Sequence, residues 1–279
     1  MDRKTNKRKS TKSKTKVIKF GNKSGCEIIS NKWIKSINDK INEIGSYDIY
    51  SKYYNFLNKK NINYLKMLDL LFSVNTYGKK MLLFLVKFKN NKNYCIMINK
   101  KSGKMILSRF RFIDELYNGT LLIGDFVKNN KTNKWLYVVS DIAYYKGLDV
   151  ITESFKKRYE ILEHIFSMEF EEDDDMSICN LELKKYFKLD KIKYITDNKD
   201  IFNYKISGLI FKNETNFSDN YLYTFIECRS DCNIKNEKEQ RIDILTNLEK
   251  DKSTESTKSK KSKTSKTSKT SKTSKTSKT

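Results

Sequence analysis

The side chains best suited to chemistry in this sequence are one histidine and five cysteines, and neither set forms a recognisable catalytic or metal site. His164 has no Ser or Cys neighbour in a pattern typical of a nucleophile–base pair, so we expect a partly exposed helix residue. Cys228 and Cys232 are spaced as CxxxC without the second pair that a structural zinc site needs, which favours ordinary reduced thiols. The remaining cysteines are scattered, at Cys26, Cys95 and Cys179.

Two further patterns with chemical potential are an acidic run and a phosphate loop. Residues 171–175 are five consecutive acids, which offer the oxygen ligands that hard cations prefer. The run lacks the spacing and central glycine of an EF-hand loop, so a solvated acidic loop over 169–175 is favoured and no metal site is expected. Neither GxxxxGK[ST] nor GxGxxG occurs, which excludes the common glycine-rich phosphate loops.

The net charge of +23 is concentrated at the two ends of the sequence. Residues 1–19 hold nine basic side chains and one acid, and residues 251–279 hold ten lysines and two acids, so each segment carries +8. The 231 residues between them carry the remaining +7. Residues 262–279 are six Ser-Lys-Thr repeats with nothing apolar to bury, which predicts disorder. Lysine-rich arms of this kind favour binding to a polyanion through counterion release.

Composition also excludes several classes of protein. The longest wholly apolar run, Met81–Val86, is six residues, whereas a membrane helix needs about 20. No apolar stretch follows the basic N-terminus, so no secretory signal and no membrane association are expected. Scattered cysteines indicate a reducing, cytoplasmic compartment. The absence of proline and the abundance of Lys, Asn and Ile indicate an AT-biased coding sequence, which lowers the information in any single lysine.

Hydrophobic spacing predicts helices and many short strands. Helices are expected over 29–44, 64–71, 153–166 and 181–187. In the third of these, Phe155, Tyr159, Leu162 and Phe166 form one stripe. Turn-forming segments separate strands, which begin as an antiparallel meander and are expected over 72–74, 80–88, 94–99, 104–108, 120–127, 135–142, 206–211 and 221–227. This order predicts an α+β fold with mainly antiparallel sheets, occupying residues 20–250 between disordered segments 1–19 and 251–279.

Five segments occur in an order and at intervals that suggest a family. They are Phe72–Phe84, Gly119–Val127, Trp135–Ile142, Ser154–Leu162 and Ser207–Phe211. Together they resemble the nucleotidyltransferase domain of mRNA-capping guanylyltransferases, especially those of large DNA viruses, which shares its fold with ligases. The resemblance covers about residues 60–227. About two dozen residues separate Glu227 from the tail, too few for the C-terminal OB domain that accompanies the fold in the family.

The resemblance implies that the residues of phosphoryl chemistry have been replaced. The family motif KxDGxR, whose lysine attacks the α-phosphate of GTP, aligns with Asn75, Thr76, Tyr77, Gly78, Lys79 and Lys80. The DGE motif aligns with Ile123, Gly124 and Asp125, and Asp141 is kept in the following strand. The acid that precedes Gly-Leu-Ile-Phe is Ser207. The two lysines of the last motif align with Thr224 and Ile226.

These replacements predict a fold that is kept and a reaction that is lost. Glycine and apolar positions remain, whereas the nucleophile and the acids that hold Mg²⁺ are gone. We expect a vestigial nucleotide cleft at Lys79, Lys80, Asp125 and Asp141, with no catalytic residue. No cofactor is expected, and GTP and Mg²⁺ would bind only if residual activity remained.

Three functions remain open at this point. The first is a noncatalytic, capping-enzyme-like accessory or scaffold protein that binds RNA, DNA or an acidic protein through its basic tails. It would act alone or in a capping or transcription complex, in a viral factory or virion. The second is an active nucleotidyltransferase that uses Lys79 or Lys80 as a displaced nucleophile. The third is a basic structural or packaging protein that self-associates.

Overall fold

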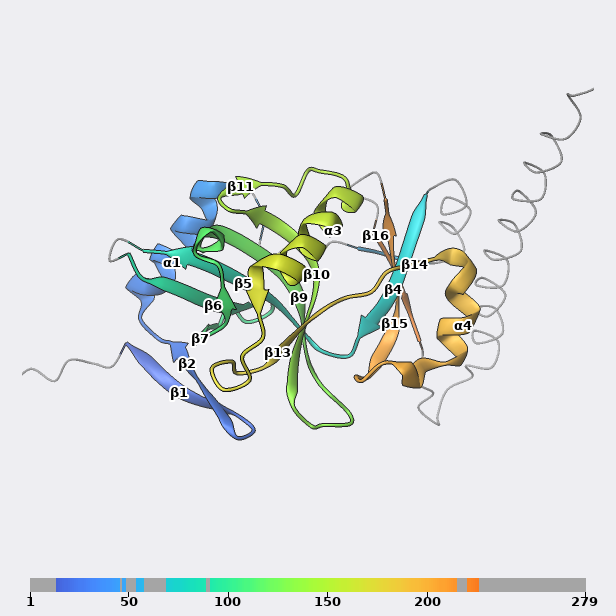
Figure 1. The fold of residues 1–279 in the computed structure, drawn as a ribbon, viewed down its shortest axis with the longest axis horizontal. Coiled ribbons are helices and arrows are strands. Elements are labelled where there is room, and N and C mark those ends of the chain that lie inside the picture. The colour runs from blue at the N-terminus through green and yellow to red at the C-terminus, as the bar shows by residue number, and fades with distance from the viewer. Residues whose placement is uncertain are drawn as a thin grey trace, which may run out of the picture.

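Two mainly antiparallel sheets of unequal size, lying side by side, organise the chain (Figure 1). The computed structural model describes residues 14–45, 47–48, 54–57, 69–88, 91–214 and 220–225. The chain passes from the smaller sheet to the larger at a tight turn, because strand β4 (Leu70–Thr76) belongs to one and β5 (Lys79–Lys87) to the other. This turn carries Tyr77 and Gly78, so the first family-like motif lies where the sheets meet.

The larger sheet has nine strands in the order β1-β2-β7-β6-β5-β9-β10-β11, with β13 added beside β10. All its pairs are antiparallel except β10 with β13. The other strands are β1 (Thr15–Phe20), β2 (Lys23–Ile28), β6 (Asn93–Asn99), β7 (Met105–Ser108), β9 (Asn118–Lys128), β10 (Trp135–Tyr145), β11 (Leu148–Asp149) and β13 (Asn180–Leu183).

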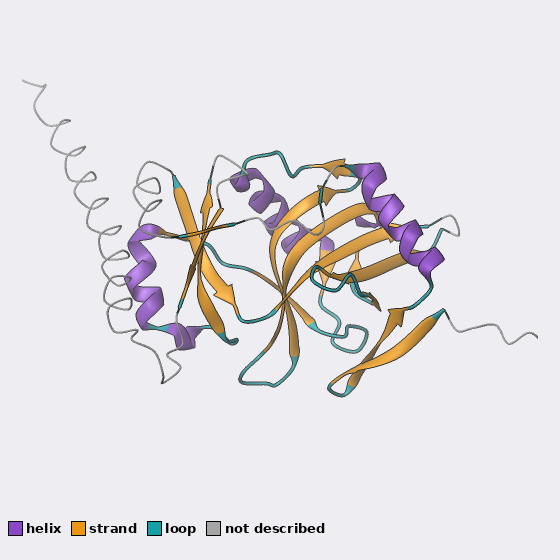
Figure 2. Ribbon diagram, turned by 180° about the vertical axis from the view of Figure 1, so that it is seen from behind, coloured by secondary structure: helices purple, strands orange, loops and turns teal. Residues whose placement is uncertain are grey.

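Helices cover both faces of this sheet, which explains the unbroken apolar run in β5. Side chains alternate between the faces of a strand. Leu82, Phe84 and Val86 pack in one core with Ile37 and Ile41 of α1 (Asn31–Ile44). Met81, Leu83 and Leu85 pack in another with Leu162 of α3 (Phe155–His164). Figure 2 shows these helices against the strands they cover. A π-helical turn, Ile165–Glu169, continues α3.

The smaller sheet has the order β14-β4-β15-β16-β3. Its core includes Val127 and Val138 of the larger sheet as well as Ile192 and Ile195 of α4 (Ile192–Asp197), so the two sheets share apolar contacts. Its remaining strands are β14 (Phe187–Lys188), β15 (Ile206–Asn213), β16 (Asn220–Thr224) and β3 (Asn55–Phe56). Separately from both sheets, β8 (Arg111–Phe112) pairs with β12 (Phe170–Glu171). Short 3-10 helices span Asp114–Tyr117, Leu189–Lys191 and Lys199–Ile201.

The predicted fold class is confirmed, and most predicted strands and the helices at 29–44 and 153–166 are present with small shifts at their ends. The predicted helix over 181–187 is wrong, because this segment pairs with β10 as β13 and then enters β14. Residues 64–68 of the predicted helix over 64–71 lie outside the described residues, whereas Leu70 and Leu71 lie in β4, since they pair with β15. The acidic stretch 169–175 is not wholly loop, because Phe170–Glu171 pairs with β8.

The predicted boundary of the N-terminal arm is also wrong. Thr15–Phe20 forms an edge strand that pairs with β2 throughout its length, so ordered structure begins before residue 20. Residues 1–13, the Ser-Lys-Thr tail, Cys228 and Cys232 lie outside the described residues. Cys26, Cys95 and Cys179 carry free thiols, and His164 is 54% exposed at the end of α3. Among the described residues, no helix is both long and apolar enough to cross a membrane.

Candidate functional site

Strands β4 and β15 bring two of the predicted site positions into direct contact. The Asn75 side-chain amide donates to Ser207 Oγ at 2.8 Å, and Ser207 Oγ donates to the Asn75 carbonyl oxygen at 3.2 Å. The strand register places Gly208 opposite Asn75, which is why residues 132 positions apart in sequence meet. Asn75 is buried, and its amide is bonded at both ends because Lys80 also donates to Asn75 Oδ1 at 3.1 Å.

Lys80 connects this pair to the buried carboxylate of Asp125. The two residues lie opposite each other in β5 and β9, with Lys80 Nζ 2.8 Å from Asp125 Oδ1. Lys184, from the segment after β13, reaches Asp125 Oδ2 at 3.0 Å and is itself almost completely buried. Burial alone would raise the pKa of Asp125, but Lys184 and Lys80 outweigh it and hold that pKa below its ordinary value.

A second buried carboxylate, Asp141 in β10, also has two cationic partners. Arg158 of α3 binds it in a bidentate manner, with Nε 2.8 Å from Oδ1 and Nη2 3.1 Å from Oδ2. Lys212 of β15 donates to Oδ2 from the smaller sheet. Burial would raise the pKa of Asp141, but Lys212 and Arg158 lower it to about 2. The Asp141 carboxylate therefore links a helix and both sheets.

The segment 184–186 joins the two carboxylate groups into one site. Lys184 N–H donates to the Val139 carbonyl at 2.8 Å, and Tyr186 O–H donates to the Ser140 carbonyl at 3.0 Å. Burial raises the pKa of Tyr186 well above its ordinary value, and both Asp141 and Asp125 raise it further, so both carboxylates act on one phenol. We call the six charged side chains the ion-pair junction: Lys80, Asp125, Asp141, Arg158, Lys184 and Lys212.

Comparison with known families decides the affiliation of this fold. A family model described as the mRNA capping enzyme, catalytic domain, matches residues 56–224, more than half of the chain. The chain belongs to the mRNA capping enzyme catalytic-domain family. Among the curated proteins, none is similar enough to match it. The matched segment contains the whole ion-pair junction together with Asn75 and Ser207, so the site lies within the capping-enzyme domain.

The junction does not fit the divalent cation that the family relationship implies. Its two carboxylates and four cations give a formal charge of +2. Each carboxylate already has two cationic partners, and a metal ion would have to displace them. Within the described part of the chain, no three His, Cys, Asp or Glu side chains gather as a metal-ligating group. These side chains are suited to neutralising one another.

Two glycines of the capping-enzyme domain are required by close strand packing. A Cβ on Gly78 would lie 2.4 Å from Val127 Cγ1 and 2.8 Å from the Phe126 carbonyl oxygen. A Cβ on Gly208 would lie 2.0 Å from the Tyr223 carbonyl oxygen. These contacts are far shorter than non-bonded atoms allow, so any larger residue would push the strands apart. Glycine at these positions therefore preserves the junction of the sheets irrespective of catalysis.

The remaining predicted positions are dispersed around the junction. Tyr77 is 68% exposed and lies against Lys205, whose Nζ is 5.0 Å from the ring centroid. Ile123 pairs with Asp141 across β9 and β10, Gly124 separates Ile123 from Asp125, and Lys79 is exposed at the start of β5. Thr224 pairs with Gly208, whereas Ile226 lies outside the described residues.

Sequence reasoning missed three of the six junction residues and Tyr186. Arg158 carried a detectable signal, because it lies three residues after Phe155 and four before Leu162, on the buried stripe of α3. A charge at that position requires a buried partner. Lys184 and Lys212 gave no such signal in a chain with so many lysines, and their partners are 59 and 71 residues away.

Proposed function

We propose that this capping-enzyme-family domain does not form a covalent nucleotide intermediate and acts as a noncatalytic, nucleic-acid-binding accessory protein. The observation that carries the proposal is the state of Asn75. An amide stands where the family resemblance places the nucleophilic lysine, with its nitrogen bonded to Ser207 and its oxygen bonded to Lys80. A carboxamide offers no amine lone pair for attack on a phosphate.

The neighbouring lysines are poor substitutes for the missing nucleophile. Burial would lower the pKa of Lys80, but Asp125 outweighs this effect and raises it, so the amine stays protonated and lacks a free electron pair. Lys79 precedes Lys80 in β5, and successive side chains of a strand point to opposite faces. Its ammonium group is therefore directed away from Asp125 and the rest of the ion-pair junction.

The charge of the terminal segments supports nucleic acid as the partner. Sixteen of the 23 net positive charges belong to residues 1–19 and 251–279. The lysines of the ion-pair junction cannot supply this attraction, because carboxylates already compensate them. Binding through many exposed lysines would be only weakly dependent on nucleic-acid sequence and would weaken steeply with salt.

Labelling with nucleotide tests the catalytic part of the proposal. The full chain is incubated with α-radiolabelled GTP or ATP and Mg²⁺, then precipitated with acid, next to an active guanylyltransferase. We expect no acid-stable label on this chain. The Asn75→Lys variant should also stay unlabelled, because Ser207 still stands at the position of the missing acid. Label on the unmodified chain with either nucleotide would overturn the claim of inactivity.

A salt titration tests the binding part. The basic residues of 1–13 and 252–278 are replaced by glutamine in the full chain, which leaves strand β1 intact. Affinity for single-stranded RNA should fall, and the plot of log affinity against log salt should become less steep by about one unit for each phosphate that the protein no longer neutralises. Equal affinity and slope for the two proteins would exclude the terminal segments as the binding elements.

A further inference from the structure

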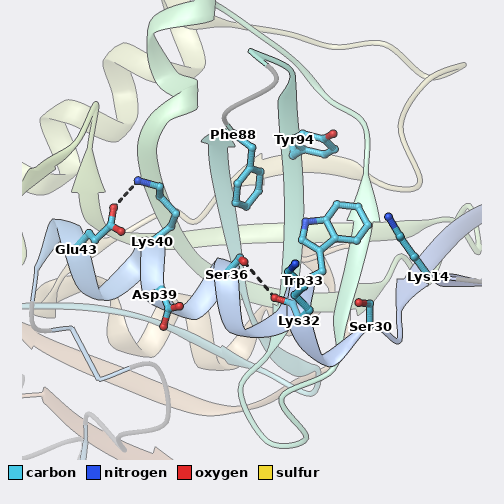
Figure 3. Close-up of a pocket in the computed structure, with 10 residues that line it drawn as sticks. All are labelled: Lys14, Ser30, Lys32, Trp33, Ser36, Asp39, Lys40, Glu43, Phe88 and Tyr94. Atoms are coloured by element: carbon cyan, nitrogen blue, oxygen red, sulfur yellow. Dashed lines mark hydrogen bonds and ion pairs between the residues drawn. The ribbon is translucent and has the colours of Figure 1, made fainter.

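A second site lies on the opposite side of the larger sheet from α3, in a groove beside α1. Trp33 of α1, Phe88 at the end of β5 and Tyr94 of β6 line it, as Figure 3 shows. The groove has a volume of about 780 Å³, within the range typical of ligand sites. Helix α1 precedes the segment that matches the capping-enzyme family, and the groove shares no residue with the ion-pair junction.

The three aromatic side chains form a wall that is rigid yet partly exposed. The Trp33 and Tyr94 rings meet edge to face with centroids 5.8 Å apart, and Phe88 and Tyr94 do so at 5.5 Å. All three pack against the core between α1 and the sheet, which fixes their positions before any ligand arrives. A preformed aromatic surface of this kind suits a flat ring, because little side-chain entropy is lost on binding.

Positive charge is concentrated at the Trp33 end of the groove. Lys14 and Lys32 are exposed there, and neither ammonium group forms an ion pair within the described residues. The Ser30 side chain does not cap α1, and no acid occupies its first turn, so the positive end of the helix dipole adds to the two lysines. At the other end, Lys40 is neutralised by Glu43, and Asp39 is acidic.

The charges in the groove and the sequence next to it indicate which class of ligand the groove binds. Lys14 directly follows residues 1–13, which contain six basic side chains and one acid, so an anion that reaches Lys14 meets a longer basic stretch. An acidic peptide would satisfy the lysines but not the aromatic wall. A duplex would offer phosphates but keep its bases stacked inside. Single-stranded nucleic acid offers both an unpaired base and the adjoining phosphates.

From these observations, we infer that the α1 groove binds single-stranded nucleic acid, with a base against Trp33 and phosphate beside Lys14 and Lys32. This inference rests on the proposed nucleic-acid-binding function and assigns part of it to the folded domain. Two exposed lysines supply electrostatic attraction, and the aromatic wall supplies a preference for unpaired bases that the basic terminal segments cannot provide.

Tryptophan emission provides a direct test, because the sequence contains only two tryptophans. In the full chain with Trp135→Phe, Trp33 is the sole reporter. Titration with a short oligouridylate should quench its emission with the same midpoint that anisotropy of a labelled oligonucleotide gives. Trp33→Leu should weaken binding roughly fivefold to a hundredfold and leave the salt slope unchanged. Lys32→Glu should weaken binding and reduce the salt slope by about one.

Matched variants outside the groove are Tyr194→Ala, an exposed aromatic on α4, and Lys131→Glu, an exposed lysine in the β9–β10 turn. Both should bind as the unmodified chain does. Two results would overturn the inference that the groove binds nucleic acid, without affecting the proposed function. One is unchanged Trp33 emission during tail-dependent binding, and the other is equal effects of Lys32→Glu and Lys131→Glu. If Trp33 is quenched and glutamine replacement of the tails has no effect on binding, the tails are not binding elements, but the inference about the groove is retained. Equal competition by duplex RNA or polyglutamate would reject a single strand as the occupant.

Discussion

The ion-pair junction and the α1 groove use basic side chains in opposite ways. In the junction, each carboxylate contacts two cations, and Arg158 and Lys184 are almost completely buried. In the groove, Lys14 and Lys32 are exposed and form no ion pair within the described residues. The junction lies wholly within the segment that matches the capping-enzyme family, whereas the groove is formed between helix α1, which precedes that segment, and Phe88 and Tyr94 within it. Availability of the side chain, rather than the number of charges, therefore separates a structural site from a candidate binding site.

The junction also joins the two sheets where they meet. Lys212 reaches Asp141 from the smaller sheet, while Asp141 and Arg158 belong to the larger sheet and its covering helix. Lys80 similarly contacts Asn75 of the smaller sheet and Asp125 of the larger. These contacts fasten one sheet to the other.

The largest expected effect is the loss of Arg158. Arg158→Met leaves Asp141 buried with Lys212 as its remaining ion-pair partner and leaves the Ile151 and Glu153 carbonyls without their guanidinium donor. The free energy of unfolding should fall by about 3–5 kcal/mol, measured by urea denaturation. Lys157→Met, which removes an exposed pair with Glu153, should change it by less than about 0.5 kcal/mol. Equal effects would mean that the junction contributes no more than a surface ion pair.

Acid should weaken the junction. The pKa of Asp141 is about 2 in the folded protein against an ordinary value of 3.8, so between these values the unfolded chain binds a proton that the folded chain does not. Stability therefore rises with pH through this window. The contribution of Asp141, about 2 kcal/mol, is complete above about pH 5 and is lost as pH falls toward 2.

Urea denaturation between pH 2 and 6 measures this dependence. Asp141→Asn should be less stable at neutral pH, because Arg158 and Lys212 lose their carboxylate, and its stability should depend less on pH in the acid range. Asp190→Asn, an exposed acid beside Lys191, is the control and should follow the unmodified protein. An unchanged acid dependence in Asp141→Asn would show that this carboxylate is not held ionised by its partners.

The sequence predicted the fold well where local pattern and tertiary pairing agree. Strands β5, β6, β9 and β10 combine apolar runs with clear turns, and all four are present. The local apolar spacing of 181–187 predicts a helix, but the segment pairs in parallel with β10, whose residues lie some 44 positions away and do not affect local periodicity. β1 was missed for a related reason, since its lysine-rich sequence resembles the basic segment before it and its strand conformation depends on β2.

The candidate site was predicted in part. Ordered motif matches singled out Asn75, Ser207 and Asp125. Strand pairing brings these three residues close to Lys80, whatever their chemistry. The motif matches could not identify Lys184 and Lys212, since the contacts of these lysines with Asp125 and Asp141 depend on how the two sheets pack. The groove could not be predicted from the sequence either, because Trp33 and Tyr94 are 61 residues apart and meet only when α1 lies on the sheet.

Removal of the Asn75 side chain should have an intermediate effect. Asn75→Ala eliminates the bonds to Ser207 and Lys80 at a buried position and should lower the free energy of unfolding by about 1–2 kcal/mol. Asn93→Ala removes an exposed amide that donates to Asp114 at 2.7 Å, and should cost less than about 0.5 kcal/mol. If the two variants were equally stable, Asn75 would not be the fastening point between β4 and β15 that its contacts indicate.

The smallest expected change in stability belongs to Lys32, and its direction is informative. Lys32 is the second residue of α1, where the helix dipole disfavours a cation and favours an acid. Lys32→Glu should therefore raise the free energy of unfolding by about 0.3–1 kcal/mol while weakening the binding of single-stranded RNA. A lysine that destabilises its own helix and strengthens ligand binding is the opposite of Arg158, whose charge is needed for folding. Urea denaturation and anisotropy on the same variant measure both quantities, and a loss of stability together with unchanged RNA affinity would remove the distinction between groove and junction.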